Sequence, residues 1–178
     1  MKVMIPLAEG FEEIEALTVV DVLRRAGMHV DTIGVVGSVI EGSHGIRVMT
    51  DKRINQINPN DYDIIVLPGG SPGYQNLARS GIITEILKNF NRQNKMIAAI
   101  CGAPLILAQI GILENRKATV YPGFERKLPY PRDRPVVVDN NIVTSQAPGT
   151  AMEFALKIVE LKLGASAAKK LKEELVVA

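Results

Sequence analysis

Residues that cross-link or stack are scarce in this sequence. Its 178 residues include one cysteine, two histidines and no tryptophan, and aromatic residues make up 4%. One cysteine cannot form an intramolecular disulfide. The 21 basic and 19 acidic residues are spread along the chain, with no basic arm and few aromatics for stacking bases. We therefore expect neither a disulfide scaffold nor a nucleic-acid partner.

Long apolar runs are also missing. No stretch approaches the roughly 20 apolar residues that span a bilayer, and acids follow the first short apolar segment at once, unlike in a signal peptide. These absences predict a cytoplasmic protein without a membrane partner. Hydrophobic residues still make up 47% of the chain, enough for the core of one domain over residues 1–178.

Apolar strands and amphipathic helices alternate along the chain. Residues 2–7 predict a strand and residues 12–26 a helix, while the continuous apolar runs at 63–67 and 96–100 are typical of parallel strands covered on both faces. Such alternation predicts an open, doubly wound α/β sheet, three layers thick. Ligands of these sheets bind beyond the carboxyl ends of the strands.

Two finer features of this pattern can be checked against a structure. In the helix at 12–26, the apolar face is expected to consist of Ile14, Leu17, Val20 and Leu23. The pair Asn140-Asn141 between two β-rich runs predicts a hairpin turn.

The single cysteine lies where a buried strand meets a helix. Cys101 follows the run at 96–100, so a sharp turn would expose its sulfur at the sheet edge in a strained backbone conformation, as in a nucleophile elbow. The start of the next helix would favour the thiolate and lower the thiol pKa. The alternative is a small, buried and inert side chain. Position alone leaves both interpretations open.

Three glycines could complete a site around that sulfur. The backbone amides of Gly69, Gly70 and Gly102 could form an oxyanion hole. The alternative for the Gly-Gly pair, which position alone favours, is a tight turn that needs positive φ.

Carboxylates and histidines are the other candidate groups. Glu12, Glu13 and Glu15 begin the first predicted helix, where acids usually complement the helix dipole. One that faced the thiol would instead transfer protons. The two histidines lack metal-ligand spacing, and no glycine motif matches a nucleotide fingerprint, so we expect no metal and no cofactor.

Several motifs occur in a fixed order and together resemble the DJ-1/ThiJ/PfpI superfamily. They are "IPLAEGFEEIEA", "DVLRRAG", "DIIVLPGG", "IAAICGAPLILA" and "TSQAPGTAMEFAL". The resemblance implies a flavodoxin-like α/β/α sandwich with a mainly parallel sheet, generally assembled as a homodimer. It also implies that Cys101 is the nucleophile, that Glu15 is its proton partner, and that Gly69, Gly70 and Gly102 supply the surrounding amides.

The sequence departs from this pattern at a few positions. The protease-like branch has a histidine directly after the cysteine, where this chain has Gly102, which argues against peptidase activity and for the DJ-1-like branch. Tyr121 stands where DJ-1-like relatives often have a histidine near the cysteine. His44 stands where relatives commonly have arginine, and it is expected to join Glu12, Asp21 and Arg25 near the dimer contact, in a structural role.

The resemblance implies a function in stress protection. The leading hypothesis is a cysteine-dependent, cofactor-independent enzyme of the glyoxalase or deglycase type, acting on small dicarbonyls or on glycated protein. A second hypothesis is an oxidative-stress sensor or redox-regulated chaperone that acts through oxidation of Cys101. A third, disfavoured because of Gly102, is an intracellular cysteine peptidase.

Overall fold

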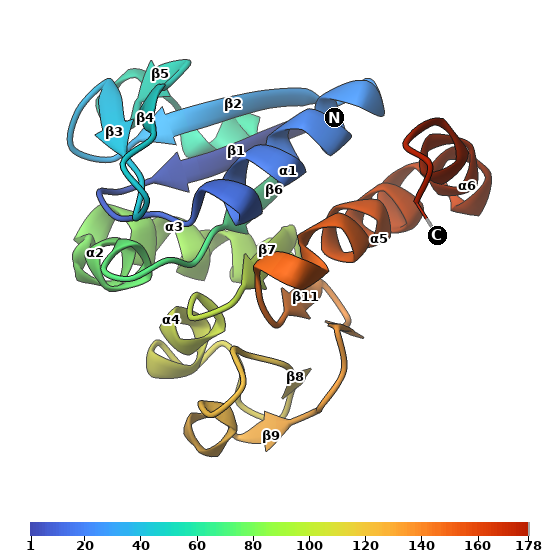
Figure 1. Ribbon diagram of the computed structural model, residues 1–178. Coiled ribbons are helices and arrows are strands. Elements are labelled where there is room, and N and C mark those ends of the chain that lie inside the picture. The colour runs from blue at the N-terminus through green and yellow to red at the C-terminus, as the bar shows by residue number, and fades with distance from the viewer. Residues whose placement is uncertain (178) are drawn as a thin grey trace.

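A mainly parallel sheet between two layers of helices organises the chain (Figure 1). The computed structural model describes residues 1–177. Its strands are β1 (Lys2–Leu7), β2 (His29–Gly34), β3 (Val39–Glu41), β4 (Arg47–Met49), β5 (Lys52–Arg53), β6 (Ile64–Leu67), β7 (Met96–Ile100), β8 (Lys117–Ala118), β9 (Tyr130–Pro131), β10 (Val136–Asp139) and β11 (Ile142–Ser145). Its α-helices are α1 (Glu13–Arg25), α2 (Gly73–Arg79), α3 (Gly81–Arg92), α4 (Pro104–Gln109), α5 (Ala151–Leu163) and α6 (Ala165–Glu174).

The order of strands in the main sheet is β10-β11-β7-β6-β1-β2-β5. All neighbours in it are parallel except β10 and β11, which form the predicted hairpin around Asn140. Asn140 has a φ of 53°, the left-handed conformation that such a two-residue turn needs and that asparagine tolerates. The predicted α/β class is therefore confirmed.

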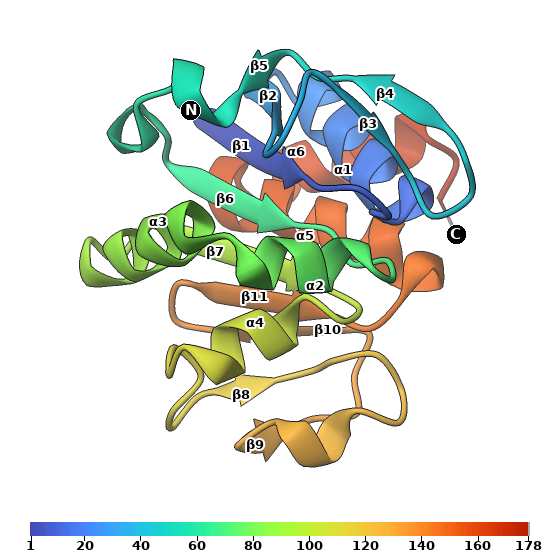
Figure 2. The same cartoon turned by 90° about the vertical axis from the view of Figure 1, so that its left-hand side faces the viewer.

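Helices cover both faces of this sheet (Figure 2). One face packs against α1, α5 and α6 through residues such as Val19 and Phe154, and the other against α2, α3 and α4 through Leu77, Phe90 and Leu107. Burial on both faces explains why β6 and β7 are apolar at every position. In residues 1–177, no helix is both long and apolar enough to cross a membrane.

The buried face of α1 differs from the predicted one. Leu23 is fully buried, but Ile14 is 55% exposed and Leu17 is 36% exposed, whereas Glu15 and Val19 are buried. The helix is rotated because loops from other parts of the chain bind the carboxylates of its first turn, including that of Glu15, which accepts a hydrogen bond from Gly69. The prediction that Ile14 and Leu17 point inward was wrong.

Candidate active site

Cys101 occupies a strained turn directly after β7. Its φ is 64°, a conformation that costs a residue other than glycine about 1–3 kcal/mol and is common at active sites. Two backbone hydrogen bonds hold the turn, from the Cys101 amide to the Ser145 carbonyl (3.0 Å) and from the Tyr121 amide to the Cys101 carbonyl (2.9 Å). The expected elbow is present, and the side chain is half-buried.

The three predicted glycines have different roles. The amides of Gly70 and Gly102 lie close enough to the Cys101 sulfur to act against the rise in its pKa, so both are available where an oxyanion would form. The amide of Gly69 instead donates to Glu15 Oε2 at 2.7 Å. A Cβ at Gly69 would lie 2.6 Å from Cys101 Cβ and 2.7 Å from Glu15 Oε2. Gly69 therefore provides space and orients the carboxyl, and the prediction that its amide joins the oxyanion hole was wrong.

Glu15 is the carboxyl beside the thiol. It is 1% exposed, and its Oε1 has no hydrogen-bond partner among residues 1–177, while the thiol of Cys101 lies close enough to the carboxyl to influence its pKa. Burial raises the pKa of Glu15 to about 7, while the Gly69 amide and the thiol act in the opposite direction. Near neutral pH this carboxyl can therefore either hold or release a proton.

The pKa of the Cys101 thiol is raised, whereas the sequence predicted that it would be lowered. Burial first, and then the charge of ionised Glu15, raise the pKa of Cys101 to about 12, although the Gly70 and Gly102 amides oppose the shift. The short helix α4 begins only at Pro104, so its dipole does not overcome the loss of solvation. A proton on Glu15 removes the like charge and turns the carboxyl into a hydrogen-bond donor for a thiolate. The two groups thus titrate as a pair.

A cavity of about 370 Å³ opens over this pair. Its lining includes Glu12, Tyr74, Tyr121 and Phe124 in addition to the pair itself. Tyr74 packs against Gly102 so closely that a Cβ there would lie 2.6 Å from the ring. Tyr74 was not predicted, because a tyrosine two residues into a helix carries no motif. The Gly-Gly turn just before it was the available signal.

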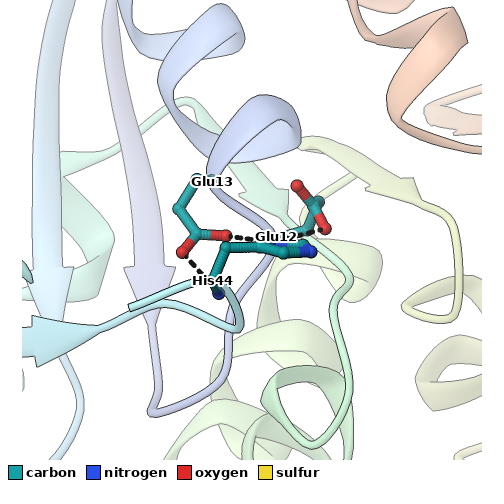
Figure 3. A group of neighbouring side chains, drawn as sticks. All are labelled: Glu12, Glu13 and His44. Carbon is teal, nitrogen blue, oxygen red and sulfur yellow. Dashed lines mark hydrogen bonds and ion pairs between the residues drawn. The ribbon is translucent and has the colours of Figure 1, made fainter. Parts of the chain in front are cut away.

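His44 lies beside the first turn of α1 and is not among the residues that line the cavity (Figure 3). Its Nδ1 is 2.9 Å from Glu13 Oε2 and 3.6 Å from Glu12 Oε2. Asp21 and Arg25 instead pair with each other at 2.8 Å near the end of the helix. Within one chain, the expected grouping of His44 with Glu12 is present, and Asp21 and Arg25 lie apart from it; whether they join it across a dimer contact stays a prediction.

Comparison with known proteins agrees with this geometry. The family model described as the DJ-1/PfpI family matches residues 1–161. The chain belongs to the DJ-1/PfpI family. Drosophila melanogaster protein dj-1beta is 36% identical over 98% of this chain and 96% of its own length. Arabidopsis thaliana DJ-1 homolog B is 40% identical over 92% of this chain, which spans only 38% of that longer protein.

Solved structures of DJ-1 proteins have the same fold. Oxidized Toxoplasma gondii DJ-1 superimposes with a TM-score of 0.96 at 40% identity, over 99% of this chain and 98% of that one. The flavodoxin-like sandwich that the sequence motifs implied is thereby confirmed for this DJ-1/PfpI protein.

Proposed function

We propose that this DJ-1/PfpI protein is a cysteine-dependent enzyme that removes reactive dicarbonyls, or the adducts they form on proteins, in protection against stress. One observation carries the proposal: a cysteine in a strained elbow, close to two backbone amides that favour its thiolate, lies beside a buried carboxyl with a pKa of about 7. This set combines a nucleophile, an oxyanion hole and a proton carrier in one small cavity.

With methylglyoxal as substrate, the Cys101 sulfur attacks the aldehyde carbon and forms a C–S bond. The oxygen of the resulting hemithioacetal lies by the amides of Gly70 and Gly102. Glu15 takes the proton from that carbon and returns a proton to the adjacent carbonyl carbon, while the hydroxyl proton of the hemithioacetal passes to the adjacent carbonyl oxygen. The second carbon thereby becomes an alcohol and the first carbon a thioester. Water then hydrolyses the thioester to give lactate and the free thiol. The reaction consumes one water molecule per methylglyoxal and involves no net oxidation or reduction.

The test is lactate formation from methylglyoxal by purified protein in the presence of a chelator. We expect Cys101→Ser to abolish the activity, and Glu15→Gln to lower kcat by roughly 10²–10⁴-fold, the usual contribution of a general acid or base. Activity that survives Cys101→Ser would overturn the proposal. A thiol with ordinary pKa and slow alkylation at every pH would favour the inert alternative.

Oxidation sensing is a second candidate function, favoured by the half-buried thiol and its two amide donors. Peroxide would convert Cys101 to a sulfenic and then a sulfinic acid, whose oxygens the amides of Gly70 and Gly102 would bind. Mass spectrometry after graded peroxide should find two added oxygens on Cys101 before methionines are oxidised. A peptidase is disfavoured because Tyr74 fills the space that a histidine at position 102 would need.

We also propose that the chain forms a homodimer. Ile14, Leu17, Ile46 and Met49 are each at least 36% exposed, and Glu13 next to Ile14 contacts the amide of Ile46, so α1 and the β3–β4 hairpin present a common apolar surface. Such patches mark protein interfaces. Sedimentation at micromolar concentration would test this assembly.

A further inference from the structure

Two glutamates and one histidine lie together outside the cysteine pair. Glu12 and Glu13 come from the start of α1, and His44 from the loop between β3 and β4 (Figure 3). Their ligand atoms all lie within 4.8 Å of one another. His44 Nδ1 is 2.9 Å from Glu13 Oε2 and 3.6 Å from Glu12 Oε2. Ligands around a tetrahedral Zn²⁺ at about 2.1 Å are about 3.4 Å apart, so both separations are close to those of a zinc site.

Backbone amides already orient both carboxylates. Glu12 Oε1 accepts a hydrogen bond from the Ile14 amide at 3.2 Å, and Glu13 Oε1 accepts from the amides of His44 (2.7 Å) and Ile46 (3.4 Å). Each glutamate therefore uses Oε1 for the backbone and turns Oε2 toward His44. Hydrogen bonds of this kind fix the ligands of metal sites and are usually built into them.

The charge of the cluster is only partly balanced. Glu12 is 8% exposed and Glu13 is 4% exposed, so two carboxylates share a largely buried place. Glu13 Oε2 accepts from Ser43 Oγ at 3.3 Å and from His44. No hydrogen-bond donor of residues 1–177 reaches Glu12 Oε2, which has only the His44 ring at 3.6 Å. Glu12 also lines the cavity next to the cysteine pair, so this oxygen can reach solvent, and a cation between the two carboxylates would reduce the repulsion of their like charges.

We propose that Glu12 Oε2, Glu13 Oε2 and His44 Nδ1 bind one divalent transition-metal ion, with Zn²⁺ the best match to this nitrogen and oxygen set and water as the fourth ligand. Binding displaces the proton of His44 Nδ1 into solution and breaks its hydrogen bond to Glu13, while the bonds to the backbone remain. The ion would tie the β3–β4 loop to α1. The site shares Glu12 with the cysteine cavity but does not depend on the proposed reaction.

The test uses the full chain with Cys101→Ser, so that the thiol cannot act as a ligand. We expect calorimetry to find one equivalent of Zn²⁺ bound, and Co²⁺ to give the visible spectrum of a four-coordinate site without thiolate bands. Both Glu12→Gln and His44→Gln should weaken binding by at least about tenfold, as loss of a ligand should exceed the roughly 10–100-fold effect of its supporting groups.

His29→Gln is the matched control, because it removes the other histidine, which pairs with Asp31 at 3.3 Å and not with the cluster. It should bind like the parent. Circular dichroism of each variant checks folding, and the mild Glu12→Gln change keeps the test valid should His44→Gln disturb the loop. Equal affinity of the parent and both cluster variants would overturn the proposal. So would binding that requires Cys101, or no binding at millimolar Zn²⁺.

Discussion

Gly69 is the position where one added methyl group should disturb both the fold and the candidate site. In Gly69→Ala the new Cβ would lie 2.6 Å from Cys101 Cβ and 2.7 Å from Glu15 Oε2, whereas carbon contacts are most favourable at about 3.5–4.0 Å. Relieving this overlap of about 1 Å costs about 1–3 kcal/mol. Displacing the carboxyl from the Gly69 amide costs about 1.5–3 kcal/mol more. Together these effects should lower the free energy of unfolding by about 2.5–6 kcal/mol.

Gly81→Ala is the matched control, because nothing lies within 4 Å of a Cβ at that position. It begins α3, where alanine should be neutral or stabilise the chain by up to about 1 kcal/mol. Urea unfolding of both variants measures the difference, and the pH profile of Cys101 alkylation reports on the site. If Gly69→Ala lost less than about 1 kcal/mol and kept the parental profile, the argument from crowding would be refuted.

Three other variants test the coupling of Cys101 with Glu15, the peptidase hypothesis and the proposed dimer. In the parent, the free energy of unfolding should fall by up to about 3 kcal/mol between pH 4.5 and 7, because the folded chain holds the Glu15 proton up to a pKa of about 7 whereas the unfolded chain loses it near 4.5. Glu15→Gln should abolish this fall, as denaturant titrations in chelator at several pH values would measure. The same dependence of stability on pH in the variant as in the parent would contradict the prediction. Gly102→His should lower the free energy of unfolding by about 1–3 kcal/mol, because the new side chain would clash with the Tyr74 ring, and it should not create peptidase activity. Denaturant unfolding and a casein assay measure the two effects, and new casein hydrolysis would support the peptidase hypothesis. Ile14→Lys with Met49→Lys should give a monomer in sedimentation, and an unchanged dimer would exclude that surface.

Much of the fold could be predicted because strands that are buried on both faces of a sheet have continuous apolar sequences. The apolar runs of β6 and β7 and the Asn-Asn turn identified their elements from local pattern alone. The position of Cys101 at the end of such a strand predicted the elbow for the same reason. These features depend on neighbours in the chain, and so the sequence is sufficient for them.

The features that were missed depend on partners distant in sequence. Which way α1 faces was decided by Gly69 and by the loop around His44, 31 residues from Glu13. The Gly69 amide was assigned to the oxyanion hole because spacing cannot say which of two adjacent amides a carboxyl will bind. The pKa of Cys101 was expected to fall because a helix start is visible in sequence, whereas the extent of burial is not.

Whether Cys101 is reactive depends on where one proton resides. Ionising both a buried thiol and a neighbouring buried carboxyl costs free energy, because two negative charges then lie close together with little solvation. The amides of Gly70 and Gly102 favour the charge on sulfur. The Gly69 amide favours charge on Glu15. The two sets of amides therefore compete for the same negative charge across a few ångströms, and small changes in the position of either carboxyl oxygen shift the balance. A substrate that displaces water from the cavity weakens solvation of both groups but leaves the amides in place. Because the pKa is about 7 for Glu15 and about 12 for Cys101, the negative charge of the resting pair lies on the carboxyl, and activation of the thiolate requires the proton to move from sulfur to Glu15.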